Sequence, residues 1–244
     1  MLLAFFCVVG TGTRRLVQAR GGEHTREELV DQAKNLLTGM SATFALFVGF
    51  AISICWGAVT AGQSAVEQQS AAIQTMAWQL RNIPDDSASA ALLDKLTRYA
   101  QTAADADGKF LARGAVTGLP SEPALDDFDD AVTAYARGAG SDRAASLLSA
   151  ASELVTSSGA VAAVANRGLP RPLATLLMCV AILVTAVMGV TTATSGRWSL
   201  VFVYVWCLVP ALSLTVVWAL AYPFALRSGL TLAPLRAVAH GLAK

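Results

Sequence analysis

The chain has 244 residues, of which 55% are hydrophobic and only 14% are charged, and its mean hydropathy is +0.53. This composition lies outside the range of soluble domains and makes the lipid bilayer the expected solvent. The formal net charge of +1 gives no reason to expect nucleic acid as a partner. We therefore expect a multi-pass protein of the cell membrane.

Three segments are long enough to cross a hydrocarbon core of about 30 Å, which takes roughly 20 apolar residues. They cover residues 37–59, 173–194 and 200–221. A shorter apolar run at residues 1–13 predicts a short or partial first membrane helix. A basic, amphipathic linker at residues 14–36 follows it, and residues 222–244 form a C-terminal tail.

The helix that begins at residue 37 is expected to continue beyond the membrane through residues 60–83. Apolar residues there repeat every seven positions, which is typical of a helical packing seam. The seam comprises Val59, Val66, Ile73 and Leu80, joined by Met76 and Ile83. Pro84 ends this helix, because the residue before a proline is disfavoured in the helical region.

A polar helical bundle is expected at residues 84–168, between the second and third membrane helices. The sequence Asp85-Asp86-Ser87 is placed to cap its first helix, and a later helix presents Leu147, Leu148, Ala151 and Leu154 to the core. We find no alternating pattern typical of strands. The predicted fold is an all-α integral membrane protein with three full transmembrane helices, a short N-terminal one and a helical-bundle insert.

The distribution of charge indicates an orientation. Five basic residues precede the first full span: Arg14, Arg15, Arg20, Arg26 and Lys34. The segment at residues 60–171 contains 13 acidic and nine basic side chains, a net charge of −4. Because basic loops stay in the cytoplasm, this bias favours an extracytoplasmic polar domain.

The sequence offers little reaction chemistry. Its four cysteines lie in apolar runs and its two histidines stand alone, so neither zinc nor redox spacing is present. The acidic run at residues 126–130 lacks the pattern of a calcium loop and is interpreted as a solvated helix face. The three full spans contain no Asp, Glu, Lys, Arg or His, which disfavours an ion-coupled carrier. We expect no catalytic residue, no metal site and no cofactor, which leaves a passive pore or a structural role.

A stripe of small residues runs through the first full span, at every fourth position from Ala45 to Ala65. Such spacing lets two membrane helices approach closely. A four-residue step drifts by about 40° around a helix, so only about three members can share one contact. We choose Gly49, Ser53 and Gly57 for this contact, the alternative being chance in an alanine-rich chain. The bulkier adjoining face, at Phe44, Val48 and Ile52, is then the candidate to face a pore.

Several stretches resemble the bestrophin-like family of bacterial membrane proteins. They are "FALFVGFAISICWGAVTAGQSAVEQQSAAIQTMAWQLRNIP", "LTRYAQTAADADGKFLARG" and the tail "YPFALRSGLTLAP". The most distinctive positions lie in the tail: Pro223, Phe224, Ser228, Gly229 and Pro234. The order of spans and insert matches that family over nearly the whole chain.

The resemblance implies a homo-oligomer in the lipid bilayer, because bestrophins proper are pentameric anion channels with four membrane helices. Their second helix lines the pore, and their large helical region is cytosolic, opposite to the side that the charge bias favours here. Our first hypothesis is a homo-oligomeric, passive anion channel. The second is a non-catalytic accessory or sensory protein whose helical domain docks on a partner membrane complex.

Overall fold

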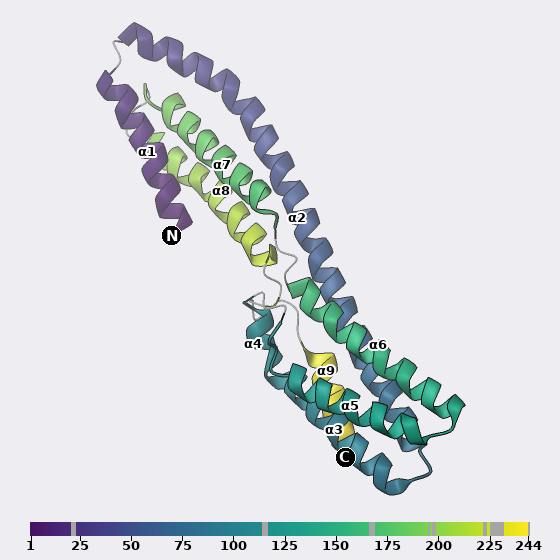
Figure 1. Cartoon of the computed structure of the whole chain (residues 1–244). Coiled ribbons are helices and arrows are strands. Elements are labelled where there is room, and N and C mark those ends of the chain that lie inside the picture. The colour runs from purple at the N-terminus through teal and green to yellow at the C-terminus, as the bar shows by residue number, and fades with distance from the viewer. Residues whose placement is uncertain are drawn as a thin grey trace. The chain divides into compact units, whose positions relative to one another are not determined.

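The computed structural model describes residues 1–20, 23–113, 117–165, 169–194, 196, 199–221, 224 and 232–243. Within these ranges every regular element is a helix, labelled α1 to α9 (Figure 1). The chain divides into two compact units, of which unit 1 comprises Met1–Trp56 and Leu169–Leu220, and unit 2 comprises Gly57–Gly168 and Ala221–Lys244. The predicted all-α fold is confirmed.

Four of the described helices are long and apolar enough to cross a membrane: Glu27–Arg81 within α2 (Glu23–Arg81), α6 (Ser141–Ala165), α7 (Arg171–Thr191) and α8 (Ser199–Ala221). Helices α2 and α8 contain the spans predicted at residues 37–59 and 200–221, and α7 covers the span predicted at residues 173–194 except its last three residues. The fourth, α6, was expected in the polar bundle, and it belongs to unit 2 with Leu147, Leu154 and Val161 buried in that unit's core.

The first two helices are longer than the sequence predicted. Helix α1 spans Leu2–Arg20 and does not end near residue 13, and α2 begins at Glu23 and not at residue 37. The basic segment at residues 14–36 is therefore largely helical. Residues 14–19 contain no proline or glycine, and Arg, Leu, Gln and Ala all favour helix, so nothing there breaks α1.

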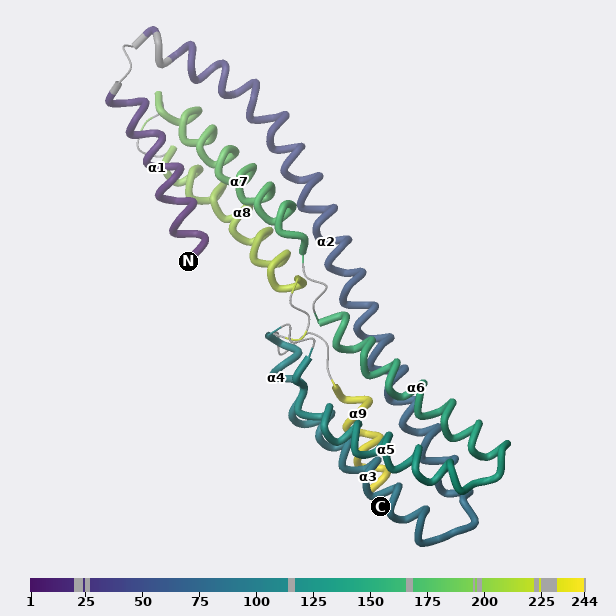
Figure 2. Tube along the Cα trace, viewed as in Figure 1, coloured from purple at the N-terminus to yellow at the C-terminus, as the bar shows by residue number. Residues whose placement is uncertain are grey.

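Unit 1 depends on a close contact between α1 and α7, which lie side by side (Figures 1 and 2). A Cβ atom added to Gly189 of α7 would collide with the carbonyl oxygen of Gly10 and the hydroxyl of Thr13, both in α1. A Cβ atom added to Gly10 would lie 3.0 Å from Cγ1 of Val203 in α8. The two glycines thus let the backbones of α1 and α7 approach closely and leave room for the Val203 side chain of α8.

A polar contact accompanies this packing. The Thr13 hydroxyl lies 3.3 Å from the carbonyl oxygen of Ala186 in α7, and it is also within reach of carbonyls in its own helix. In lipid a hydroxyl must find its partner within the protein, because the hydrocarbon offers none. The α1–α7 contact therefore combines close backbone packing with a satisfied polar group.

Unit 2 is a helical bundle whose core follows the predicted seam of α2. Val66, Ile73, Met76, Leu80 and Ile83 are all buried there, between 0% and 4% exposed. The buried faces of α3 (Asp86–Asp105), α5 (Glu122–Gly138) and α6 complete the core. The seven-residue repeat therefore identified the packing face of this part of α2 correctly.

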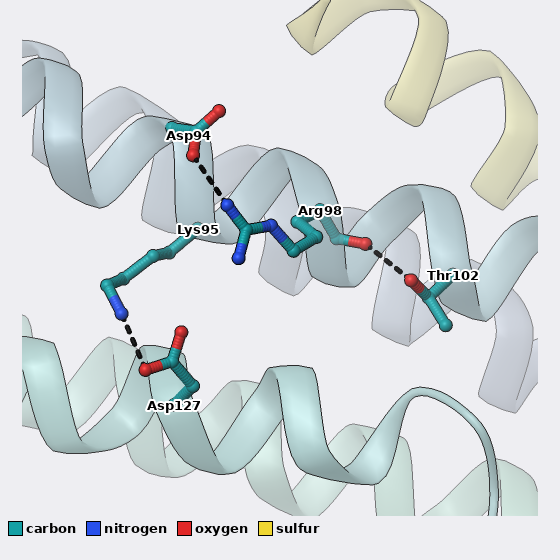
Figure 3. Close-up of polar contacts among 5 residues, drawn as sticks. All are labelled: Asp94, Lys95, Arg98, Thr102 and Asp127. Carbon is teal, nitrogen blue, oxygen red and sulfur yellow. Dashed lines mark hydrogen bonds and ion pairs between the residues drawn. The ribbon is translucent and has the colours of Figure 1, made fainter.

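The α3–α5 contact carries charged residues on its rim (Figure 3). Lys95 of α3 lies 2.6 Å from Asp127 of α5, and Arg98 pairs with Asp94 on its own helix at 3.1 Å. At the start of α3 the Asp85 carboxylate accepts hydrogen bonds from the backbone N–H groups of Ser87 and Ala88. The predicted N-cap is confirmed, and these hydrogen bonds lower the pKa of Asp85.

A buried polar group joins the short helix α4 (Asp107–Leu111) to α5. The Asp107 carboxylate accepts hydrogen bonds from the hydroxyl of Ser121 at 2.5 Å and from its backbone N–H at 3.1 Å. Burial raises the pKa of Asp107 above its ordinary value of 3.8, despite these hydrogen bonds. Tyr99 and Glu122 are its titratable neighbours.

Two features of unit 2 differ from expectation. The tail contains a further helix, α9 (Ala233–Leu242), which packs against α3 and buries Leu235, Val238 and Ala239. The three- and four-residue spacing of Leu235, Val238 and Leu242 is the signal that sequence reasoning missed. Leu148 is 41% exposed and does not belong to the core as predicted, because α6 buries its neighbour Leu147 instead.

The Gly10–Gly189 contact predicts that Gly189→Ala destabilises the protein by about 1–3 kcal/mol, the usual effect of overpacking. The new methyl group would meet backbone, which cannot move aside as a flexible side chain can. Gly12→Ala on α1 is the control, because its Cβ would meet no atom within 4 Å. A thermal melt of the purified protein should show a lower Tm for Gly189→Ala alone, and equal values for both variants would contradict the contact.

Asp107 predicts a pH dependence of stability. Because its pKa is raised in the folded state, its contribution to stability is present at low pH and is lost as the pH rises through that pKa. The Tm of the wild type, measured relative to Asp107→Asn, should therefore fall as the pH rises above about 4, the ordinary pKa of an aspartate. If the Tm of the wild type minus that of Asp107→Asn stays constant or grows as the pH rises, the pKa of Asp107 is not raised in the folded protein.

Candidate functional site

The membrane segment of α2 has one face buried by the chain itself. Its buried residues are Phe44, Val48, Ala51, Cys55 and Val59, each at most 9% exposed. Their spacing of three or four residues places them on a single stripe. This stripe is the packing face of α2.

The opposite face of the segment is open and carries the predicted trio of small residues. Gly49, Ser53 and Gly57 are exposed, and a Cβ added to either glycine would meet no atom within 4 Å. The two glycines therefore do not mediate close packing inside one chain. The contact between copies that the sequence suggested for them stays a prediction.

The residues predicted to face a pore lie elsewhere. Phe44 and Val48 are 5% and 9% exposed and belong to the buried stripe, while Ile52 is half-buried. The chain's own atoms cover the first two. Phe44 and Val48 could line a pore only if the residues that cover them moved away.

Large apolar side chains flank the small trio on the exposed surface of α2. They are Leu46, Phe50, Ile54 and Trp56, which are 71%, 59%, 37% and 57% exposed. Residues 37–59 contain no Asp, Glu, Lys, Arg or His, so this surface suits either hydrocarbon or another apolar helix.

The tail motif is only partly described. Pro223, Ser228 and Gly229 lie outside the described residues. Phe224 packs against the core of unit 2, and Pro234 lies in the first turn of α9, where a proline's missing N–H is tolerated. Phe224 and Pro234 therefore both contribute to the packing or helix structure of unit 2.

The acidic run at residues 126–130 lies on α5. Asp127 pairs with Lys95 (Figure 3). Phe128 and Val132 on the same helix are buried in the core. Across the ranges that the structure describes, no group of three His, Cys, Asp or Glu side chains is placed to hold a metal ion. The run's observed contact is an ion pair between helices.

These features define a multi-pass, all-helical membrane protein with a helical bundle built partly on the extension of its second helix. The bestrophin-like domain matches residues 4–227, and the chain belongs to the bestrophin-like family. None of the curated proteins with which the chain was compared matches it.

The fold is similar to that of a bacterial bestrophin homologue from Klebsiella pneumoniae. One crystal structure of a variant of that homologue has a TM-score of 0.73 and 12% identity, covering 99% of this chain and 98% of that chain. A second variant gives 0.73 and 14%, covering 98% and 95%. The structure solved by zinc phasing gives 0.72 and 12%, covering 98% and 96%. At such low identity the likeness establishes a shared fold.

Proposed function

We propose that the chain forms a homo-oligomer that surrounds a passive, non-catalytic pathway for ions, with anions as the first candidates. The observation that carries this proposal is the two-sided membrane segment of α2. One face is buried by the chain itself, whereas the face bearing Gly49, Ser53 and Gly57 is left open. An open face of small residues is suited to another helix.

The physical reason lies in the bilayer. Lipid tails are as apolar as leucine, so membrane helices associate through close van der Waals packing more than through hydrophobic burial. Small side chains permit that approach, and the trio is short enough to share one helix-to-helix contact despite its drift around the helix. Gly10 and Gly189 show that this chain uses the same device between α1 and α7.

The ion pathway in this proposal does not use Phe44 or Val48, because the chain covers them. Residues 37–59, 173–194 and 200–221 contain no charged side chain, so hydroxyl groups, backbone or apolar constrictions would bound the pathway. Ile52 retains partial exposure beside the open face. A pentameric count follows the resemblance to bestrophins proper and belongs to the proposal.

Substitutions in the trio test the assembly. Gly49→Leu and Gly57→Leu should break the oligomer and abolish conductance in planar bilayers, since each adds a bulky side chain to the contact. Ser53→Gly, which keeps the face small, is the matched control and should preserve both. The readouts are particle mass in nanodiscs and current across several anions and cations.

Unchanged particle mass for both leucine variants would refute the contact, and an intact wild-type oligomer that conducts no ion would refute the channel.

The accessory-protein alternative is favoured by Trp78, whose side chain is 68% exposed on unit 2. An exposed tryptophan of this size is typical of docking surfaces. Native purification with stoichiometric foreign subunits would support that alternative.

We further propose that the polar domain is extracytoplasmic, as the charge bias at residues 60–171 favours. A protease site inserted after Gly140, in the connection between α5 and α6, should then be cut by protease added to intact spheroplasts. A cytoplasmic protein in the same cells serves as the control for lysis. Cleavage only after permeabilisation would place the domain inside, as in bestrophins proper.

A further inference from the structure

A cavity of about 490 Å³ lies within unit 1, between α1, the connection from α7 to α8, and α8 itself. Its described lining comprises Thr11, Arg14, Arg15, Gln18, Gly196, Leu200 and Tyr204. The volume falls within the range of about 300–1,000 Å³ that is usual for small-molecule sites. The bestrophin-like fold and the proposed channel assign no role to this cavity.

Arg14 is built into the wall of the cavity. Its side chain is 6% exposed, and its Nη2 donates a hydrogen bond to the carbonyl oxygen of Gly196 at 3.3 Å. One turn further along α1, Nε2 of Gln18 donates to the carbonyl oxygen of Ala193 at 2.9 Å. These bonds hold α1 against the α7–α8 connection, so the guanidinium group has a fixed position.

The chemistry of the lining selects an anion. Arg14 and Arg15 supply two guanidinium groups, and Tyr204 adds a phenolic hydroxyl, whereas the described lining contains no carboxylate. The planar donor fork of arginine matches the oxygens of a phosphate group, which it binds through two parallel hydrogen bonds.

The position of the cavity suits a phosphate at the membrane surface. Helix α7 ends at Thr191 and α8 begins at Ser199, so Gly196 lies in the connection between two spans and outside the hydrocarbon core. This is the depth at which phospholipid headgroups lie. Basic pockets between membrane helices at this depth bind anionic headgroups.

We propose that this cavity binds a phosphate group through Arg14 and Arg15, as part of an anionic phospholipid headgroup or as free inorganic phosphate. Arg14 provides the fixed inner contact, since it is buried and anchored to Gly196. Arg15 is exposed and provides the outer contact at the mouth. Tyr204 lies across the cavity on α8 and can donate from its hydroxyl.

The test uses the full-length protein in a neutral detergent with two separate probes, phosphatidylglycerol and inorganic phosphate. Bound lipid is counted by native mass spectrometry, and phosphate binding is measured by calorimetry. Arg15→Gln should weaken binding about tenfold or more, the loss expected for a charge-assisted hydrogen bond. Arg15→Lys, which keeps the charge without the fork, should restore binding in part.

Lys34→Gln is the matched control, because it removes one positive charge from an exposed position of α2 that does not line the cavity. Arg15 is exposed, so its variant should fold, and an unchanged Tm without ligand verifies this. Lipid binding lost in Arg15→Gln but kept in Lys34→Gln assigns a lipid headgroup, and the same pattern with inorganic phosphate assigns the free ion. Equal weakening by both variants, or no binding of either probe to the wild type, overturns the proposal.

Discussion

The structure depends on the burial of one stripe of α2. From Phe44 to Val59 this stripe packs against the chain's own atoms, and from Val66 to Leu80 the same helix supplies the seam of the bundle core. Both units are therefore built on different parts of one helix. Because this stripe occupies one side of α2, only the residues on the other side remain exposed to lipid or to another copy.

The bilayer explains why small residues have two different uses here. Between α1 and α7, Gly10 and Gly189 bring two backbones of one chain together, and no side chain could replace either without moving a neighbour. On α2, Gly49 and Gly57 are also glycines, but a Cβ atom added to either would meet no atom within 4 Å. Composition alone does not separate these uses, because only the packing partner differs.

Much of the fold could be predicted from the sequence, and the reasons are physical. The seam through Val66 and Ile73 was predictable because its apolar residues recur at helical spacing among polar neighbours, the pattern of a helix that packs one face against a core. Asp85 was predictable as a cap because a proline directly precedes it and the backbone N–H groups that follow need an acceptor. Helix α9 was also predictable, because Leu235, Val238 and Leu242 have the three- and four-residue spacing of an amphipathic helix.

The membrane face was harder to predict. Lipid-facing and protein-facing residues of a span are equally apolar, so hydropathy could not show that Phe44 and Val48 would be covered by the chain itself. The Gly10–Gly189 contact was hidden for the same reason, since the sequence shows small residues but not their partners. The cavity at Arg14 was missed because the basic segment was treated as a linker, whereas α1 continues through it as a helix.

The central claim is that the open face of α2 is the contact between copies of this chain around an axis. Particle images of the purified protein in lipid nanodiscs test this most directly. The account predicts a symmetric assembly in which the Gly49–Gly57 face of each copy lies against a neighbouring copy. A single chain, or an assembly in which that face contacts only lipid, would contradict it.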